Sequence, residues 1–186
     1  ESSIKKNKNL KNSTTSIIVY EVARLLKKYK ILNCYRENND IIFYKDINIG
    51  IAIDSGSNLR VPVIHQADRK SLHEINELVN KYLILYVENK LTSTMIDNCT
   101  FTISDLSNIN VIDFKPLLVE NQSGILGITT SFNYQNSLYS MFNLILAFDH
   151  YVTEGYVVAK FLNDLKDRLE NYDNALNSEN NIRNKK

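Results

Sequence analysis

The residues best placed to do chemistry in this 186-residue chain follow a short apolar run that ends at Phe148. His150 comes two positions later, with Asp149 directly before it and Glu154 four positions after it. A histidine side chain titrates near neutral pH, so a histidine held at the end of a strand beside carboxylates suits proton transfer. Gly155 then precedes a new amphipathic segment. If the protein carries out chemistry, this arrangement predicts proton transfer at His150.

Each of these residues also has a simpler interpretation. A lone histidine at the end of a strand is more often a packed or surface residue than a base, and Glu154 then fixes a loop or an ion pair. Taken alone, Ser104 is typical of a serine at the end of a strand or in a turn. The other two histidines, His65 and His73, are expected at the surface.

Three helices are predicted from the spacing of apolar residues. The first begins at a Ser13 or Thr14 cap and runs to residue 29. The second begins at a capping box formed by Ser71 and Glu74 and runs to about residue 89. The third spans residues 156–170. These helices must cover a sheet, because strand-like runs lie between them.

The strand-like runs are short and apolar or β-branched, and they lie at 41–44, 47–53, 59–64, 100–104, 124–130 and 141–148. We expect a turn at 38–40 and a hairpin across residues 45–46. Pro62 restricts its run to an edge or irregular strand. The resulting fold class is α+β, a mixed sheet with two or three helices packed on it.

Composition limits the classes of function. The formal charge is +1, with 44% apolar and 23% charged residues, which gives no electrostatic reason to expect nucleic acid. No apolar run approaches the ~20 residues that span a bilayer, so no membrane contact is predicted. Cys34 and Cys99 are expected to be free thiols in a reducing compartment, the cytoplasm or alternatively the mitochondrial matrix. No metal site is expected, because histidines and cysteines are so few.

The chain is predicted to hold one domain. Residues 1–12 are polar and lysine-rich and are expected to form a solvated tail. Residues 13–170 carry the periodic elements and form the domain. Residues 171–186 are charged and rich in asparagine, a composition that predicts a disordered tail.

An ordered series of motifs resembles the catalytic core of the 2-oxo acid dehydrogenase acyltransferases, the dihydrolipoyl transacylases, which share a fold with chloramphenicol acetyltransferase. The last segment resembles the family signature D-H-R-x-x-D-G. The resemblance covers roughly residues 14–170, with the segments in the family's order. The residues that carry it are 48–54 (NIGIAID), 59–64 (LRVPVI), 67–72 (ADRKSL), 90–91 (KL), 100–104 (TFTIS), 114–117 (FKPL), 124–128 (GILGI) and 148–155 (FDHYVTEG).

The chain departs from the family pattern at several positions. Tyr151 stands in place of the signature arginine, and Glu154 in place of the signature aspartate. Ser107 replaces the glycine of the family's S-N-L-G turn. The family's opening strand and helix have no counterpart before Ser13, so the opening segment of the fold is expected to be missing.

The resemblance implies an acyltransferase that moves an acyl group between coenzyme A and a second thiol, dihydrolipoyl or a carrier protein's phosphopantetheine. It assigns the general base to His150 and oxyanion stabilisation to Ser104, with Asp149, Glu154 and Gly155 in supporting roles. No cofactor is expected to be tightly bound, since coenzyme A and lipoyl groups are substrates. The resemblance also implies a homotrimer or larger cage, within a dehydrogenase-type complex, in which His150 and Ser104 of one site come from different chains.

Two other functions stay open. A non-catalytic copy of the fold could scaffold a 2-oxo acid dehydrogenase-type complex, and the changes at Tyr151, Glu154 and Ser107 favour that alternative. Retention of His150 and Ser104 favours the enzyme. Acyl transfer to a small amine or hydroxyl, as in chloramphenicol acetyltransferase, is the third alternative, and the 48–54 and 100–104 motifs fit it less well.

Overall fold

A computed structural model describes residues 13–56, 58–133 and 140–172. The helices are α2 (Thr14–Lys28), α3 (Leu72–Val87) and α4 (Gly155–Glu170), with short 3-10 turns at Lys30–Leu32, Ala67–Arg69 and Ser93–Met95. The strands are β1 (Cys34–Glu37), β2 (Asp40–Phe43), β3 (Ile49–Ala52), β4 (Val63–Ile64), β5 (Phe101–Asp105), β6 (Gly124–Ile128), β7 (Phe132–Asn133), β8 (Ser140–Met141) and β9 (Leu144–Phe148).

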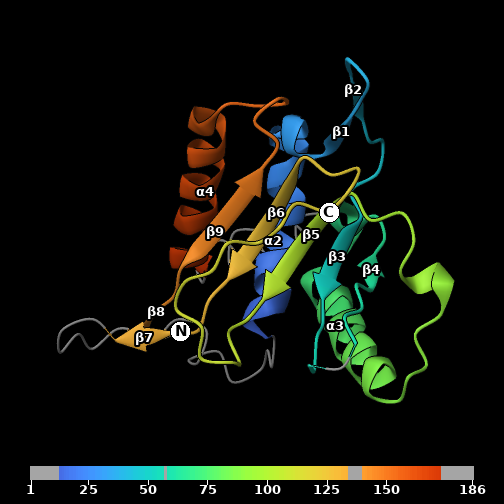
Figure 1. Cartoon of the computed structure of the whole chain (residues 1–186). Helices are drawn as coiled ribbons and strands as arrows, with labels where there is room; N and C mark the ends of the chain where they lie inside the picture. The colour runs from blue at the N-terminus through green and yellow to red at the C-terminus, as the bar shows by residue number, and fades with distance from the viewer. Residues whose placement is uncertain (1–12, 57, 134–139, 173–186) are drawn as a thin grey trace, which may run out of the picture.

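The main sheet has five strands in the order β4-β3-β5-β6-β9. Strands β3, β5 and β6 are parallel, whereas β4 and β9 run antiparallel at the two edges. In Figure 1, β5 and β6 point downward and β9 points upward, toward the turn that leads into α4. The C-terminal end of β9 therefore lies beside the N-terminal ends of β5 and β6.

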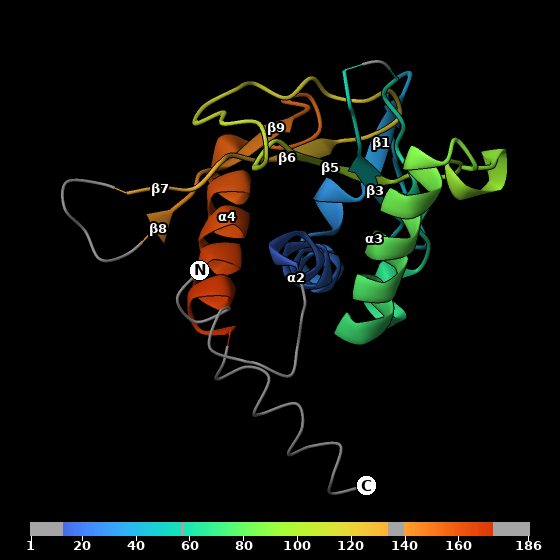
Figure 2. The same ribbon diagram turned by 90° about the horizontal axis from the view of Figure 1, so that it is seen from below.

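Three helices pack on one face of this sheet (Figure 2). Helix α2 lies between α3 and α4 and contacts both. Side chains that point from the sheet toward the helices form one continuous core with them; Phe101, for example, lies 6.4 Å from the Phe161 ring of α4. Because α2 is covered on both flanks, its sequence is apolar over more than a single stripe, and Ile17, Ile18 and Val19 are all buried.

The helix starts follow from local side-chain chemistry. Ser13 accepts a hydrogen bond from the Ser16 backbone N–H at the start of α2. Ser71 and Glu74 form the predicted capping box at the start of α3. At α4 the N-cap residue is Glu154, whose side chain makes no capping bond. The three predicted helices are thus confirmed to within two residues at each end.

The other face of the sheet carries no helix and is covered by the connection between β5 and β6 (Figure 2). Ser104 and Gly127 are paired on β5 and β6. A Cβ atom added to Gly127 would lie 2.6 Å from the Phe114 ring, which shows that this ring packs directly on the strand. A larger residue at this position would displace the ring.

Some predicted strands were wrong in detail. The hairpin does not cross residues 45–46: β1 pairs with β2 across Asn38 and Asn39, and β3 pairs with β4 and β5 instead. Asn38 has a φ of 55°, so this asparagine pair supplies the left-handed residue that a tight turn requires. The run at 59–64 is a strand only at Val63 and Ile64, on the sheet edge, as Pro62 predicted. The run at 141–148 divides into part of β8 and β9.

The predicted tail at residues 1–12 and most of the tail at 171–186 lie outside the described residues. Tyr172 falls within the predicted disordered tail at 171–186, but it is 4% exposed and belongs to the core.

Candidate active site

His150 lies in a tight turn between β9 and α4. The turn is held by the backbone and carboxylate of Asp149: its N–H donates to the Ser123 carbonyl at 3.1 Å, and its Oδ1 accepts from the Tyr151 N–H at 2.8 Å. The Asp149 carbonyl also accepts the Val152 N–H at 3.0 Å. Asp149 therefore shapes the turn that presents the histidine.

The imidazole of His150 has two neighbours. Its ring lies 5.1 Å from the Phe148 ring, and its Nδ1 lies 3.6 Å from Glu154 Oε2. The side chains of His150 and Glu154 are 70% and 78% exposed in the single chain. A carboxylate facing Nδ1 favours a proton on that nitrogen, which leaves Nε2 to accept a proton from an incoming group. This is the arrangement that a general base needs.

Glu154 and Gly155 follow the turn and form the start of α4. Glu154 is the N-cap of α4 but turns its carboxylate to His150 instead of to the helix N-H groups. Gly155 is the first helical residue, and a Cβ added there would come no closer than 4.0 Å to Phe148. No close approach explains this glycine.

Ser104 is half-buried on β5, on the helix-free face of the sheet. The turn beyond it is fixed by Asp105, whose Oδ1 accepts the Ser107 N–H at 2.9 Å. Ser107, which replaces the family's glycine, has no left-handed backbone, so the turn tolerates a side chain here. The loss of that glycine leaves the position of Ser104 intact.

The structure brings His150, Asp149, Glu154 and Gly155 together but leaves Ser104 apart from them. Ser104 pairs with Gly127, whereas the β9 residue that precedes the His150 turn pairs with Gly124, three residues earlier on β6. Strand geometry then separates Ser104 from the end of β9 by roughly 10 Å along the strands and roughly 10 Å across them. Within one chain the two side chains cannot reach the same reacting carbon.

One contact of the turn that carries His150 was not predicted from the sequence. The Arg36 guanidinium carbon lies 4.3 Å from the centre of the Tyr151 ring, and Tyr151 directly follows His150. Arg36 belongs to β1, more than a hundred residues earlier in the chain. No local motif signals such a contact, because it depends on how the β1–β2 hairpin packs against the turn.

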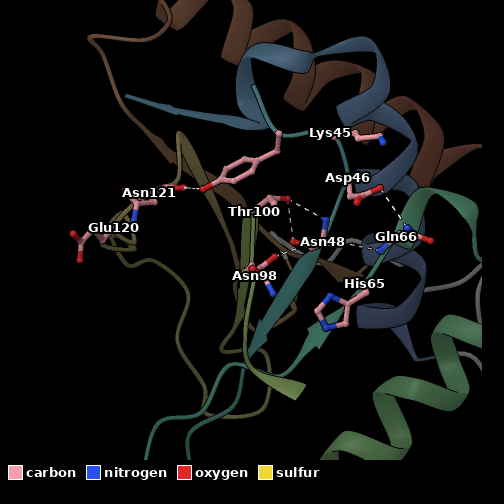
Figure 3. A pocket seen from close by; sticks show the side chains of 11 residues that line it. Lys45, Asp46, Asn48, His65, Gln66, Asn98, Thr100, Glu120 and Asn121 are labelled. Carbon is pink, nitrogen blue, oxygen red and sulfur yellow. Dashed lines mark hydrogen bonds between the residues drawn. The ribbon is translucent and has the colours of Figure 1, made fainter. Parts of the chain in front are cut away.

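A polar pocket of about 620 Å³ opens at the same end of the sheet as His150, around the segments that precede β3, β5 and β6 (Figure 3). Asn48 organises its wall, since its amide donates to the Asn98 carbonyl and accepts the Gln66 N–H, each at 2.9 Å. No motif predicted this pocket, because its residues come from four separate segments. The lining residues are Tyr44, Lys45, Asp46, Asn48, His65, Gln66, Asn98, Cys99, Thr100, Glu120 and Asn121.

Other catalytic groups have little support in the described part of the chain. Cys34 and Cys99 are free, and burial raises the pKa of each thiol, which disfavours the reactive thiolate. Among the described residues no three His, Cys, Asp or Glu side chains gather as a metal site would require. Within those same residues, no helix has the length and apolar character needed to cross a membrane. Proton transfer by His150 is the chemistry that the geometry supports.

Comparison with known protein families identifies the class. The model for the 2-oxoacid dehydrogenases acyltransferase catalytic domain matches residues 1–177, and the chain belongs to this family. The predicted family resemblance is thereby confirmed.

Among curated relatives, the chain is 29% identical over 173 residues to the dihydrolipoyllysine-residue succinyltransferase component of the 2-oxoglutarate dehydrogenase complex of Buchnera aphidicola from Acyrthosiphon pisum. That alignment covers 90% of this chain and 41% of the relative. The chain thus spans about two fifths of the length of the curated relatives it matches first.

Solved structures confirm the fold. The truncated catalytic core of the 2-oxoacid dehydrogenase multienzyme complex from Thermoplasma acidophilum superposes with a TM-score of 0.81 at 34% identity, covering 89% of this chain and 77% of that one. Chloramphenicol acetyltransferase, at 11% identity and a TM-score of 0.58, shares the fold alone, with 83% of this chain and 77% of that chain covered. The predicted α+β, chloramphenicol acetyltransferase-like fold is confirmed.

A third structure concerns the site residues. The dihydrolipoamide acetyltransferase of Azotobacter vinelandii superposes with a TM-score of 0.78 at 26% identity, covering 90% of this chain and 72% of that one. The crystallographic and enzymatic work on that protein addressed the roles of a serine, a histidine and an asparagine in its catalytic mechanism. In that protein the asparagine follows the histidine by four positions, the same spacing that separates His150 from Glu154 here.

Proposed function

We propose that this chain is an acyltransferase domain that moves an acyl group between coenzyme A and a second thiol. One observation supports this most strongly. His150 is exposed at the end of β9 with a carboxylate at Nδ1, while Ser104 lies at the opposite end of the same sheet. Each chain therefore carries the base at one end of its sheet and the oxyanion donor at the other, so a complete site needs two copies of the chain.

The reaction follows from the two half-sites. The Nε2 atom of His150 takes the proton from the attacking thiol, whose sulfur forms a bond to the thioester carbonyl carbon. The carbonyl oxygen becomes negative, and the Ser104 hydroxyl of a neighbouring copy donates a hydrogen bond to it. When the intermediate collapses, the bond to the departing sulfur breaks, and the imidazolium returns its proton to that thiolate. No covalent acyl-enzyme is needed.

The names of the relatives suggest the substrates. The matched proteins include dihydrolipoyllysine-residue succinyltransferase and acetyltransferase components. Dihydrolipoyl is accordingly the preferred second thiol, and a carrier protein's phosphopantetheine is the alternative. Coenzyme A and lipoyl groups act as substrates here, so we propose no tightly bound cofactor.

The assembly is part of the proposal. The matched structures include the cubic core of the pyruvate dehydrogenase multienzyme complex, to which the chain is 26% identical with a TM-score of 0.76, over 90% of this chain and 72% of that one. A homotrimer, alone or built into a larger cage, would bring the His150 end of one copy to the Ser104 end of the next. Dehydrogenase-complex subunits and a lipoyl domain would then be its partners.

The test is thiol-release acyl transfer from acetyl-, succinyl- and branched-chain acyl-coenzyme A to dihydrolipoamide and to a phosphopantetheine mimic. We expect His150→Ala to lower the rate at least about a hundredfold, the usual contribution of a general base, while leaving the oligomer intact. The matched control is His73→Ala, since His73 is exposed on α3 and pairs with Glu77 one helical turn later. Equal rates for His150→Ala and the parent would refute the role of His150. A folded parent without transfer from any donor would favour the scaffold instead.

A further inference from the structure

We infer that Arg36 is a positioning residue for the general base, acting through the face of the Tyr151 ring. The inference rests on the proposed function, since it assigns a role within the same site. It concerns the position where this chain departs from the family signature: a tyrosine follows His150, and a guanidinium reaches that tyrosine from β1. The guanidinium carbon lies 4.3 Å from the ring centre, well inside the range of a cation–π contact.

Arg36 lies close to the base of the β1–β2 hairpin, where β1 begins at the buried Cys34. Beside it, the Tyr35 and Tyr44 rings lie 5.1 Å apart, and the Tyr44 hydroxyl donates to the Asn121 carbonyl at 2.8 Å. At the start of β1, the Cys34 thiol donates to the Ile31 carbonyl at 3.1 Å. These contacts fix the base of the hairpin, at Cys34 and Tyr44, to the body of the domain. Arg36 lies two residues beyond the buried Cys34, so it can hold what it contacts against this fixed base.

The turn that carries His150 is held through its backbone, while its side chains face solvent. Asp149 holds its backbone, yet the His150 and Tyr151 side chains are both mainly exposed. Within the described residues, the ring and the charged group found beside the imidazole are those of Phe148 and Glu154. The contact between Arg36 and the Tyr151 ring therefore restricts the motion of the turn on its solvent-exposed side.

Charge supports the same role. Asp149 and Glu154 place two carboxylates on the turn, one before and one after His150 in the sequence. Arg36 is the cation that the described structure places against this turn, and no ion pair of its own is recorded there. Its guanidinium is thus engaged by the Tyr151 ring and remains available to offset the negative charge around the base.

The experiment is a double-mutant cycle on acyl transfer by the full chain. The variants are Arg36→Met, which removes the charge, Tyr151→Ala, which removes the ring, and the two combined. Tyr151→Phe keeps the ring and serves as the conservative variant. The matched control is Lys160→Met, because Lys160 makes the same kind of exposed contact with the Tyr156 ring on α4, at 5.5 Å.

A cation–π contact can shift the population of competent turn conformations only by its own free energy. We therefore expect Arg36→Met and Tyr151→Ala each to lower kcat about two- to fivefold with KM unchanged. The double variant should be no slower than the slower single variant, while Tyr151→Phe and Lys160→Met keep the parent kcat. Unchanged kcat in Arg36→Met, or losses that multiply in the double variant, would overturn the inference.

A second readout does not depend on turnover. Diethyl pyrocarbonate modifies accessible imidazoles, and mass spectrometry separates His150 from His65 and His73, which act as internal references. We expect the His150 modification rate to change at least about twofold in Arg36→Met and Tyr151→Ala, and to stay constant in Lys160→Met. If the parent transfers no acyl group, the proposed function fails, and this rate still decides the inference. An unchanged His150 rate in both variants would overturn it.

Discussion

Gly127→Ala tests whether the Phe114 ring packs on β6 beside Ser104. The added methyl group would lie 2.6 Å from Phe114 Cζ and 3.1 and 3.2 Å from its two Cε atoms. Carbon atoms prefer to be about 3.5–4.0 Å apart, so the ring must move by roughly 1 Å. Overpacking of this kind costs about 1–3 kcal/mol of the free energy of unfolding.

The assay is urea unfolding of the parent, of Gly127→Ala and of the same change in a Phe114→Ala background. We expect the midpoint to fall with the m-value unchanged, and Tm to fall by about 2–4 °C for each kcal/mol lost. In the Phe114→Ala background the cost of Gly127→Ala should shrink to within about 0.5 kcal/mol, because the ring that it strikes is absent. The matched control is Gly155→Ala, where the nearest atom is 4.0 Å away and alanine favours a helix start more than glycine does.

Two results would refute this reasoning. If Gly127→Ala costs the same with and without the Phe114 ring, the ring does not pack as the structure places it. If Gly155→Ala destabilises as much as Gly127→Ala, the available space around the two glycines does not decide the outcome.

Three further predictions concern charge and capping. Hydrogen bonds from Lys28 and from the Tyr29 hydroxyl lower the pKa of Asp164. This carboxylate therefore stabilises the fold above its unfolded-state pKa of about 3.8, and the stability is lost as pH falls through the lower folded-state value. Asp164→Asn should weaken the dependence of the urea midpoint on pH below pH 4, and an unaltered profile would contradict these hydrogen bonds. Arg168 Nη1 donates to the buried Glu21 carboxylate at 2.8 Å, and Arg168→Met removes this donor. The free energy of unfolding measured in urea should fall by about 1.5–3 kcal/mol, and a variant as stable as the parent would contradict this. Glu154→Asp should raise the free energy of unfolding by about 0.5–1 kcal/mol, because aspartate is a better N-cap for α4. A lower urea midpoint would contradict this and show that the longer glutamate side chain stabilises the turn.

Elements with strong local signals could be predicted from the sequence. The Ser71–Glu74 capping box marks the start of α3 by two reciprocal hydrogen bonds within four residues. The apolar run at 124–130 was predicted to be a strand, and the structure forms β6 over Gly124–Ile128, with all five residues buried. The errors fell where pairing is decided by distant partners: residues 47–53 were predicted to pair across 45–46, but β3 pairs with β4 and β5, which come later in the chain.

The site divides in the same way. His150, Asp149, Glu154 and Gly155 are neighbours in sequence, so a motif could predict that they lie together. The Arg36–Tyr151 contact and the pocket around Asn48 join segments that are far apart in the chain, and no spacing rule connects them. The separation of Ser104 from His150 depends on strand order and direction, which only the fold supplies.

The departures from the family pattern differ in their structural consequence. Ser107 is accommodated, because the Asp105 carboxylate holds its N–H and the backbone there is not left-handed. Glu154 keeps a carboxylate against the imidazole at the cost of a helix cap. Tyr151 brings a new partner, Arg36, to the turn. None of the three removes a group that the proposed chemistry needs.

The most direct test of the account is complementation between two defective variants. His150→Ala and Ser104→Ala, each expected to be nearly inactive alone, are denatured, mixed in equal amounts and refolded together, with each variant refolded alone as the control. If one site takes its histidine from one copy and its serine from the next, random mixing leaves about one quarter of the sites intact, and acyl transfer should recover to about a quarter of the parent rate. If both residues act within one chain, every site in the mixture stays defective, and a mixture no faster than the separate variants would contradict the account.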